Sequence, residues 1–553
     1  MTPSPASVFL CPVLCFLLLN LRWIPSSLGL GLLWGLFLAA FGTSDTIFAN
    51  DTASSSSSSS SYLGNLLVVP MDGSHWVGMK AIAQEMGRRG HRVTVVIPEV
   101  SMQMGPGKYY DTVIHPVLYD RAYIDSVTSV HKDMMQKSAQ SFIQKIKTRF
   151  AVTQKITDLI YRTAESLLFN DSLISHLAQQ GFDAVLTDPM VPTGSLIARK
   201  LGIPTINLLR GMPFFLDMRS AGCPCPPSYV PRFFTGYSDK MSFKERVVNT
   251  LVSVYRHIYT GRCMHEERIF KKSQSHIQVN IVILCLNRID LILEFPRPLM
   301  PNMVLVGGIN CNVRNPLPED LESWVSGEFG FVVFTLGTMV SDLPEEKTSI
   351  FLEAFRQIPQ KVIWRYTGQV PDNVPENVKM MGWVPQNDLL AHPGARAFIT
   401  HAGSHGIFEG LCHAVPMVMM PMRADQHDNA ERLANKGAGV VVDIFSITTE
   451  SLLQGLNEVL HDVRYKEDVQ KLSALHKDRP VEPLDLSVYW TEYVMRHKGA
   501  KHLKPAGIDL NWIQYFCLDV IALLASVVLL FGILIVKCMK LCFRKLSRKR
   551  KRD

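Results

Sequence analysis

Short apolar runs that alternate with amphipathic stretches predict an α/β fold in the first half of the chain. Runs of this length, rich in Val, Ile and Leu, are typical of parallel strands that are buried on both faces. The intervening stretches carry apolar residues at helical spacing, as in Gly78–Arg89 and Thr193–Leu201. Strands are expected at Leu66–Val69, Arg92–Ile97, Ala184–Leu186 and Thr205–Leu208.

The same alternation restarts after the proline-rich stretch Phe295–Pro301, which we interpret as a linker between two domains, 65–295 and 296–475. The pattern predicts two doubly wound, Rossmann-like α/β domains. Because ligands bind at the carboxyl ends of the strands in such sheets, a cleft between the domains is the expected site. The strands of the second domain are expected at Val304–Val306, Phe331–Leu336, Lys361–Tyr366, Ala397–Thr400 and Met417–Met420.

Both ends of the chain are apolar. Leu28–Ala40 ends in small residues, which predicts a signal peptide over residues 1–42; an uncleaved anchor is the alternative. Residues 43–64 contain a run of serines, typical of a flexible spacer. At the other end, residues 516–536 carry one charge, Asp519, and are long enough to cross the ~30 Å hydrocarbon core as a helix.

The charge is concentrated beyond this segment. The chain of 553 residues has a net charge of +8, and residues 537–553 hold nine Lys or Arg and one Asp, so the other 536 residues are neutral in sum. That distribution removes the main argument for nucleic-acid binding. It places the tail in the cytosol and the globular part in the lumen. Lys549 and Lys551 resemble a dilysine retrieval signal of the endoplasmic reticulum; a plain stop-transfer cluster is the alternative.

Composition and short motifs add limits. Apolar residues make up 47% and charged residues 19%, which excludes a wholly disordered chain. Asn50 and Asn170 begin glycosylation sequons on the predicted luminal side. The pairing of the luminal cysteines cannot be read from their spacing. They are Cys223, Cys225, Cys263, Cys285, Cys311 and Cys412.

A glycine-rich turn in the second domain predicts a phosphate site. It follows a strand and opens a helix, where free N–H groups and the helix dipole favour an anion. Glu409, on the first turns of that helix, lies within reach of ribose hydroxyls. The residues expected around the diphosphate are His401, Gly403, Ser404, His405 and Gly406.

Two flanking motifs strengthen this interpretation. Trp383 is suited to stack on a base, and Gln386 to read the edge of that base; core packing is the alternative for the tryptophan. Asp425 and Gln426 follow a strand and are suited to hold sugar hydroxyls.

The segment from Trp383 to Asn429, with its WVPQ, THAGSHG and DQHDNA motifs, resembles the signature of UDP-glycosyltransferases of the GT-B type. Segments near residues 475–480 and 494–499 are similar to vertebrate UDP-glucuronosyltransferases, closest to family 1. The resemblance implies UDP-glucuronate as donor, small lipophilic acceptors and a single-pass membrane protein of the endoplasmic reticulum. Thr338 stands where the family more often has Ser; both offer a hydroxyl to the donor.

The family also implies a His–Asp pair, which falls on His75 and Asp188. Each residue follows a predicted strand of the first domain, and a neutral imidazole suits removal of a proton from an acceptor hydroxyl. The turn before His75 lacks G-x-G-x-x-G, so a nicotinamide enzyme is not indicated. No metal or further cofactor is expected.

Three alternatives stay open. The donor could be another UDP-sugar, such as UDP-glucose or UDP-xylose, or the protein could bind UDP-sugars without turnover as a regulatory partner. Residues 476–515 are expected to hold a helix, Leu484–Met495, that in the family packs back on the first domain; a membrane-facing surface is the alternative. Partners implied by the family are the lipid bilayer and oligomers with itself or related transferases.

Overall fold

The computed structural model describes residues 62–129, 135, 142–191, 193–209, 221–232, 235–263, 282–311, 315–423 and 425–549. All of them belong to one compact unit, Tyr62–Asp553. The predicted signal peptide, the serine run and the Asn50 sequon lie outside the described residues.

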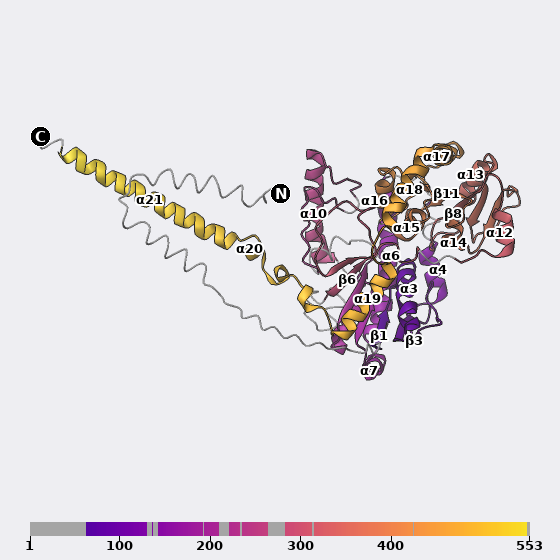
Figure 1. The fold of residues 1–553 in the computed structure, drawn as a ribbon, viewed down its shortest axis with the longest axis horizontal. Coiled ribbons are helices and arrows are strands. Elements are labelled where there is room, and N and C mark those ends of the chain that lie inside the picture. Colours follow the sequence, from indigo (N-terminus) through magenta and orange to yellow (C-terminus); the bar gives the residue numbers. More distant parts are fainter. Residues whose placement is uncertain are drawn as a thin grey trace. The chain divides into compact units, whose positions relative to one another are not determined.

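The first domain is built on a parallel sheet with strand order β3-β2-β1-β4-β5-β6-β7 (Figure 1). Its order reverses between β1 and β4, which are neighbours in the sheet although β2 and β3 come between them in sequence. The strands are β1 (Asn65–Val69), β2 (Arg92–Pro98), β3 (Asp111–His115), β4 (Ala184–Thr187), β5 (Thr205–Leu209), β6 (Val282–Asn287) and β7 (Met303–Leu305). The helices are α3 (Ser74–Arg88), α4 (Arg121–Thr128), α6 (Phe142–Leu168), α7 (Asp171–Gln179), α8 (Thr193–Leu201) and α10 (Phe243–Cys263).

The second domain is a parallel sheet with order β10-β9-β8-β11-β12-β13, and it reverses between β8 and β11. Its strands are β8 (Phe331–Thr335), β9 (Lys361–Arg365), β10 (Val378–Met381), β11 (Ala395–Thr400), β12 (Met417–Met419) and β13 (Gly439–Val441). The helices are α12 (Glu319–Val325), α13 (Glu345–Arg356), α14 (Gln386–Leu390), α15 (Ser404–Cys412), α16 (Gln426–Ala434), α17 (Thr449–His461) and α18 (Val463–Lys477). A stacked aromatic group, Phe334, Phe351 and Trp364, fills the core on one face of the sheet.

One strand was predicted in the wrong domain. Residues 304–306 were expected to open the second sheet, but β7 pairs with β6, with Val304 opposite Leu286, and so closes the first sheet. The prolines of Phe295–Pro301 therefore lie in a connection inside the first sheet, between β6 and β7. Proline ends a strand or helix by local geometry, and this effect carries no information about which sheet the next strand joins.

The helix α19 (Pro483–Arg496) returns to the first domain, as the family resemblance implied, and lies beside α3 (Figure 1). Its Val488, Val494 and Met495 are buried in the core of the first sheet. Apolar burial of this kind contributes about 1.5–3 kcal/mol for each large side chain.

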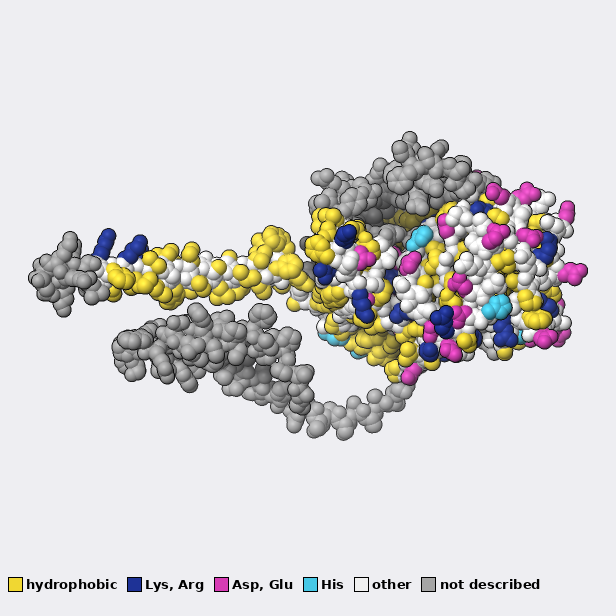
Figure 2. All heavy atoms as spheres, turned by 90° about the horizontal axis from the view of Figure 1, so that it is seen from above, with side chains coloured by type: hydrophobic (Ala, Val, Ile, Leu, Met, Phe, Trp, Pro, Cys, Tyr) yellow, Lys and Arg dark blue, Asp and Glu magenta, His cyan; other side chains and the backbone are white. Residues whose placement is uncertain are grey.

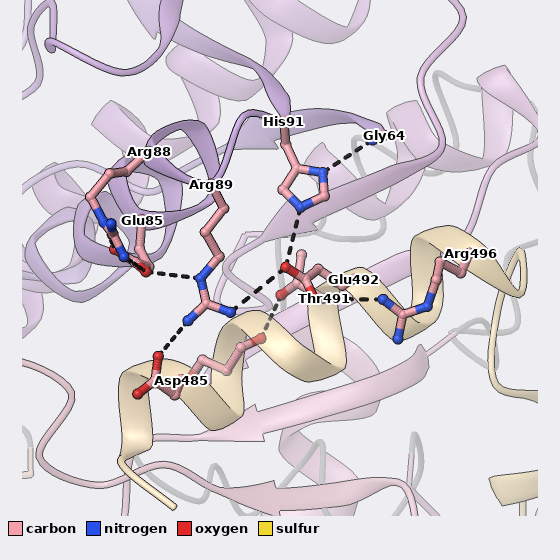
Figure 3. Close-up of polar contacts among 10 residues, drawn as sticks. Gly64, Glu85, Arg88, Arg89, His91, Asp485, Thr491, Glu492 and Arg496 are labelled. Carbon is pink, nitrogen blue, oxygen red and sulfur yellow. Dashed lines mark hydrogen bonds and ion pairs between the residues drawn. The ribbon is translucent and has the colours of Figure 1, made fainter. Parts of the chain in front are cut away.

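Polar contacts fix the angle of α19 on α3 (Figure 3). Arg89 donates to Glu85 of α3 and to Asp485 of α19. Nδ1 of the buried His91 accepts the Gly64 N–H at 3.1 Å, so its Nε2 carries the proton that faces Glu492 at 3.2 Å. Glu492 also faces Arg496, at 3.5 Å.

After α20 (Trp512–Tyr515), the chain forms α21 (Leu518–Lys549). Its stretch Leu518–Arg544 is long and apolar enough to cross a membrane, which fits a single-pass anchor. Figure 2 shows hydrophobic side chains along this helix and basic ones toward its far end. The span predicted at 516–536 thus begins two residues before the helix does.

Replacing Glu492, which accepts the hydrogen bond from His91 Nε2, is expected to weaken the packing of α19 on the first domain. Glu492→Ala leaves a buried imidazole N–H unpaired, which costs about 1–3 kcal/mol, so the melting temperature of the detergent-solubilised protein should fall by several degrees. Glu353→Ala, which removes an ion pair to Arg356 with both side chains about half exposed, is the control and should change little. An equal fall in melting temperature in Glu492→Ala and Glu353→Ala would contradict the role given to Glu492.

Candidate functional site

A cavity of about 1110 Å³ is lined by residues that follow the strands of both sheets. The two switch points in strand order, β1/β4 and β8/β11, supply loops to its wall. In open α/β sheets ligands bind at such points. The cavity is therefore the candidate site, and its two halves are built by different domains.

His75 and Asp188 meet in the half formed by the first domain. The parallel pairing of β1 and β4 sets Val69 opposite Thr187, so the residues that follow the two strands share one edge. His75 Nδ1 lies 2.6 Å from Asp188 Oδ2, and the side chains are 14% and 3% exposed. A carboxylate only accepts hydrogen bonds, so Nδ1 donates and Nε2 keeps its lone pair. The second oxygen of Asp188 accepts the Met190 N–H at 2.9 Å, which fixes the carboxylate.

A second acid holds the turn that carries His75. Asp72 accepts backbone N–H groups from Gly73 at 2.6 Å, Met102 at 2.7 Å and Gln103 at 3.2 Å. Gly73 adopts φ 76°, a conformation that favours glycine, directly before α3 begins. These bonds tie the loop after β2 to the start of α3, so His75 lies on the first turn of a fixed helix. No pattern in the sequence had pointed to Asp72.

The glycine-rich turn of the second domain lies between β11 and α15. Thr400 pairs with Thr335 of β8, so Thr338 and His401 follow neighbouring strands and both line the cavity. The His401 ring packs against Gly337, where a Cβ would lie 2.5 Å from Cε1 and the backbone has φ 79°. Gly403 and Gly406 also line the cavity, at the start of α15, where free N–H groups favour an anion. Ser404 is buried and lies outside the cavity wall.

Gln386 and Glu409 are joined in a chain of hydrogen bonds. The Gln386 amide accepts from the Thr335 hydroxyl and donates to one oxygen of Glu409. The other oxygen of Glu409 lies 3.2 Å from Nε2 of His405. Gln386 and Glu409 both line the cavity, and the bond from Gln386 orients Glu409. The contact of Gln386 with a base edge stays a prediction.

Arg288, which was not among the site residues predicted from the sequence, extends this chain of hydrogen bonds into the first domain. It follows β6, is buried, and donates from Nη2 to Nδ1 of His405 at 2.8 Å. His405 therefore carries its proton on Nε2 and donates it to Glu409. The sequence signal that could have identified Arg288 is a lone arginine directly after a strand, but β6 (Val282–Asn287) had not been predicted.

Trp383 lies at the cavity with 67% of its surface exposed, which excludes the core-packing alternative. The guanidinium of Arg365 lies 5.9 Å from its ring centroid. An exposed tryptophan face of this kind suits stacking with a flat base.

Asp425 and Gln426 line the cavity beyond β12. Asp425 Oδ2 accepts from Asn429 at 3.0 Å, and Gln426 Oε1 accepts the backbone N–H groups of Met422 and Arg423. The Gln426 side chain thus shapes the loop that presents Asp425.

The first-domain wall is mostly apolar away from His75. Helices α4 and α6 contribute Ile124, Val127, Ile156, Leu159 and Ile160. Apolar walls with a few polar groups are typical of sites for small lipophilic molecules.

Cysteine pairing was not readable from the sequence; among the cysteines that the structure describes, Cys311 and Cys412 form a disulfide. Together with His476 these residues form a group compact enough to hold a metal. Their sulfurs are bonded to one another, so they are not thiolate ligands. Nδ1 of His476 lies 2.6 Å from Asp290, and this cluster is outside the cavity wall.

Known proteins resemble the chain over most of its length. The family model "UDP-glucoronosyl and UDP-glucosyl transferase" matches residues 64–553. UDP-glucuronosyltransferase 1A6 of Homo sapiens is 44% identical over 498 residues, covering 88% of this chain and 93% of that protein. UDP-glucuronosyltransferase 1A1 of Homo sapiens is 42% identical over 501 residues, covering 89% and 94%.

Solved structures show the fold at lower identity. Spinosyn forosaminyltransferase SpnP superposes with a TM-score of 0.53 at 20% identity, covering 79% of this chain and 100% of that one. Os79 from O. sativa, in complex with U2F and trichothecene, gives a TM-score of 0.54 at 15% identity, covering 78% and 100%. The two facing parallel sheets are the GT-B glycosyltransferase fold.

Acidification is expected to destabilise the first domain through His115, which ends β3 and lines the cavity. Burial lowers the pKa of His115 from 6.5 to about 4. Between these values the unfolded state binds a proton that the folded state refuses, so the free energy of unfolding falls by up to ~3 kcal/mol as pH drops through this range. Urea unfolding at about pH 7 and about pH 5 measures about 2 kcal/mol of this loss, because pH 5 lies about 1.5 units below 6.5.

His115→Gln should flatten this pH dependence, because glutamine does not titrate. The exposed His461→Gln is the control and should leave the slope unchanged. An unchanged slope in His115→Gln would show that other groups cause the acid loss.

Proposed function

The chain belongs to the UDP-glucoronosyl and UDP-glucosyl transferase family, and from this premise we propose that it transfers glucuronic acid from UDP-glucuronate to hydroxyl groups of small lipophilic acceptors, with inversion. The observation that carries the proposal is the His75–Asp188 pair in the wall of a cavity whose other half holds the α15 turn. The names of the relatives support glucuronate as the sugar.

The proposed reaction is a single displacement. Nε2 of His75 takes the proton of the acceptor hydroxyl, and Asp188 stabilises the imidazolium that forms. The acceptor oxygen bonds to the anomeric carbon while the bond from that carbon to the diphosphate breaks on the opposite face. UDP leaves with the electron pair, and its charge is stabilised by the N–H groups at the start of α15. The step uses no metal or cofactor besides the donor.

Each predicted donor residue has a place in this scheme. Trp383 stacks on the uracil, and Glu409, held by Gln386 and His405, accepts from the ribose hydroxyls. Thr338, His401, Gly403 and Gly406 surround the diphosphate, with Ser404 contributing through its backbone. Asp425 and Gln426 hold the sugar hydroxyls.

Two other functions are less well supported. Transfer from UDP-glucose or UDP-xylose would use the same residues and is distinguished by a panel of UDP-sugars. A regulatory protein that binds UDP-sugars without turnover has no use for a hydrogen-bonded His–Asp pair at the cavity wall.

The proposed location is the membrane of the endoplasmic reticulum, with the catalytic part in the lumen and the basic tail in the cytosol. The apolar part of α21 and the basic residues from Lys537 onward support this orientation. A leader over residues 1–42 and contact with the bilayer belong to the same proposal. Association with related transferases is proposed from the family resemblance alone.

Removing the base should abolish transfer and spare the donor site. His75→Ala should lower kcat by about 10²–10⁴-fold, and Asp188→Asn should lower it strongly as well, because the wrong tautomer is then favoured. Binding of UDP, measured by protection against thermal unfolding, should stay unchanged. The exposed His176→Gln is the control. Full turnover in His75→Ala would overturn the assignment of the base.

Luminal orientation predicts a glycan on Asn170. Its Oδ1 caps α7 by accepting the Leu173 N–H at 3.0 Å, so replacing Asn170 also disturbs a helix. Ser172→Ala destroys the sequon and keeps the cap, and should remove one glycosidase-sensitive mobility shift on a gel. Thr52→Ala tests the Asn50 sequon in the same way. A wild-type protein with no glycosidase-sensitive shift would contradict the luminal placement.

A further inference from the structure

We propose that Arg423 supplies the positive charge that recognises the carboxylate of the donor sugar, and so makes the site selective for UDP-uronates over neutral UDP-sugars. This inference rests on the proposed function, because it names a determinant of donor choice within that site. Neither Asp425 nor Gln426 can fill this role: one is an anion and the other is neutral.

The cavity wall contains few fixed cations. Among its described lining residues, the Lys and Arg side chains are Arg365 and Arg423. UDP-glucuronate carries two anionic groups, the diphosphate and the carboxylate of the sugar. The position of each arginine therefore decides which group it meets.

Arg365 belongs to the nucleotide end. It ends β9, its Nη1 donates to the Gly337 carbonyl, and its guanidinium lies over the Trp383 ring. Gly337 directly precedes Thr338, which is expected beside the diphosphate. The bond to Gly337 and the contact with Trp383 keep this cation beside the base and the phosphates.

Arg423 belongs to the sugar end. It lies two residues before Asp425, and its own N–H donates to Gln426 Oε1 at 3.0 Å, so its backbone is held by a residue expected to bind the sugar. Its side chain crosses to the β8 loop, where Nη2 lies 2.9 Å from the Met339 sulfur. The guanidinium thus lies between the Asp425 loop and the residue after Thr338, across the stretch where a donor sugar has to sit.

The chemistry of the contact favours an incoming carboxylate. A thioether is a weak acceptor, whereas a carboxylate accepts two parallel, charge-assisted bonds from the planar fork of a guanidinium. Arg423 is half-buried, so the pair would be partly shielded from water. A neutral sugar offers no charge to this cation. Hydrogen bonds to charged groups contribute about 1.5–3 kcal/mol, which corresponds to a preference of about 10–100-fold.

The test compares donors rather than total activity. Microsomes expressing the full chain are assayed with a simple phenol and with UDP-glucuronate or UDP-glucose. Arg423→Gln should raise the KM for UDP-glucuronate by about 10–100-fold and leave kcat/KM for UDP-glucose within about threefold. Arg423→Lys keeps the charge and loses the fork, so it should restore part of the preference.

Two further variants control the experiment. Arg464→Gln removes an exposed arginine at the start of α18, far along the chain from the cavity residues. It should leave KM and kcat/KM unchanged with both donors. Arg423→Met keeps an unbranched chain beside Met339. It should repeat the glutamine result, and it replaces that variant if the glutamine protein does not fold.

The outcomes separate the two hypotheses. A wild-type protein that uses UDP-glucose and not UDP-glucuronate overturns the proposed function. A wild-type protein that prefers UDP-glucuronate, with the same preference in Arg423→Gln and Arg423→Met, leaves the proposed function intact and overturns the role of Arg423. An equal loss with both donors also overturns that role, because it indicates general damage to the loop.

Discussion

The parallel pairing of two strand pairs, β1 with β4 and β8 with β11, decides where chemistry can occur in this molecule. In each pair the strands are neighbours in space but distant in sequence, so the loops after them converge at one edge. The first pair brings His75 within 2.6 Å of Asp188, which lies 113 positions away. The second brings Thr338 and His401 to one wall of the cavity. The proposed base and the proposed anion-binding turn can then face each other only if the two domains are held together.

The segment after β6 makes much of that connection. Arg288 contacts His405, Asp290 contacts His476 and Arg479, and Glu294 contacts Arg432. Burial is the largest single effect on the pKa of Asp290 and raises it, but the hydrogen bonds from His476 and the Ile292 N–H, together with the attraction of His476 and Arg479, outweigh burial, so the pKa is lowered. These partners lie on α15, on α16, and at or just after the end of α18, so three positions on one short loop contact three parts of the second domain. Helix α19 then returns the chain to the first domain.

Local signals in the sequence predicted much of the fold and the candidate site. Buried strands showed as apolar runs, and His75, Asp188 and Trp383 each stood at the end of a run or within a specific motif. Three features depended on distant partners and were missed. The sheet that β7 joins is set by pairing with β6, and Arg288 gains its meaning from a histidine 117 positions later. The partner of Cys311 lies 101 residues away, and spacing alone could not reveal it.

The chain of bonds from Gln386 through Glu409 and His405 to Arg288 has a thermodynamic consequence. Nε2 of the His405 ring contacts the Glu409 carboxylate of the second domain. Nδ1 of the same ring accepts a hydrogen bond from the Arg288 guanidinium of the first domain. Whatever strengthens the bond at one nitrogen polarises the other. If a ribose at Glu409 alters the affinity of the first domain for its own ligand, that ligand must alter the affinity for the ribose by the same factor. The His405 ring is therefore the contact through which occupancy of one ligand site would be coupled to the affinity of the other, by the same factor in both directions.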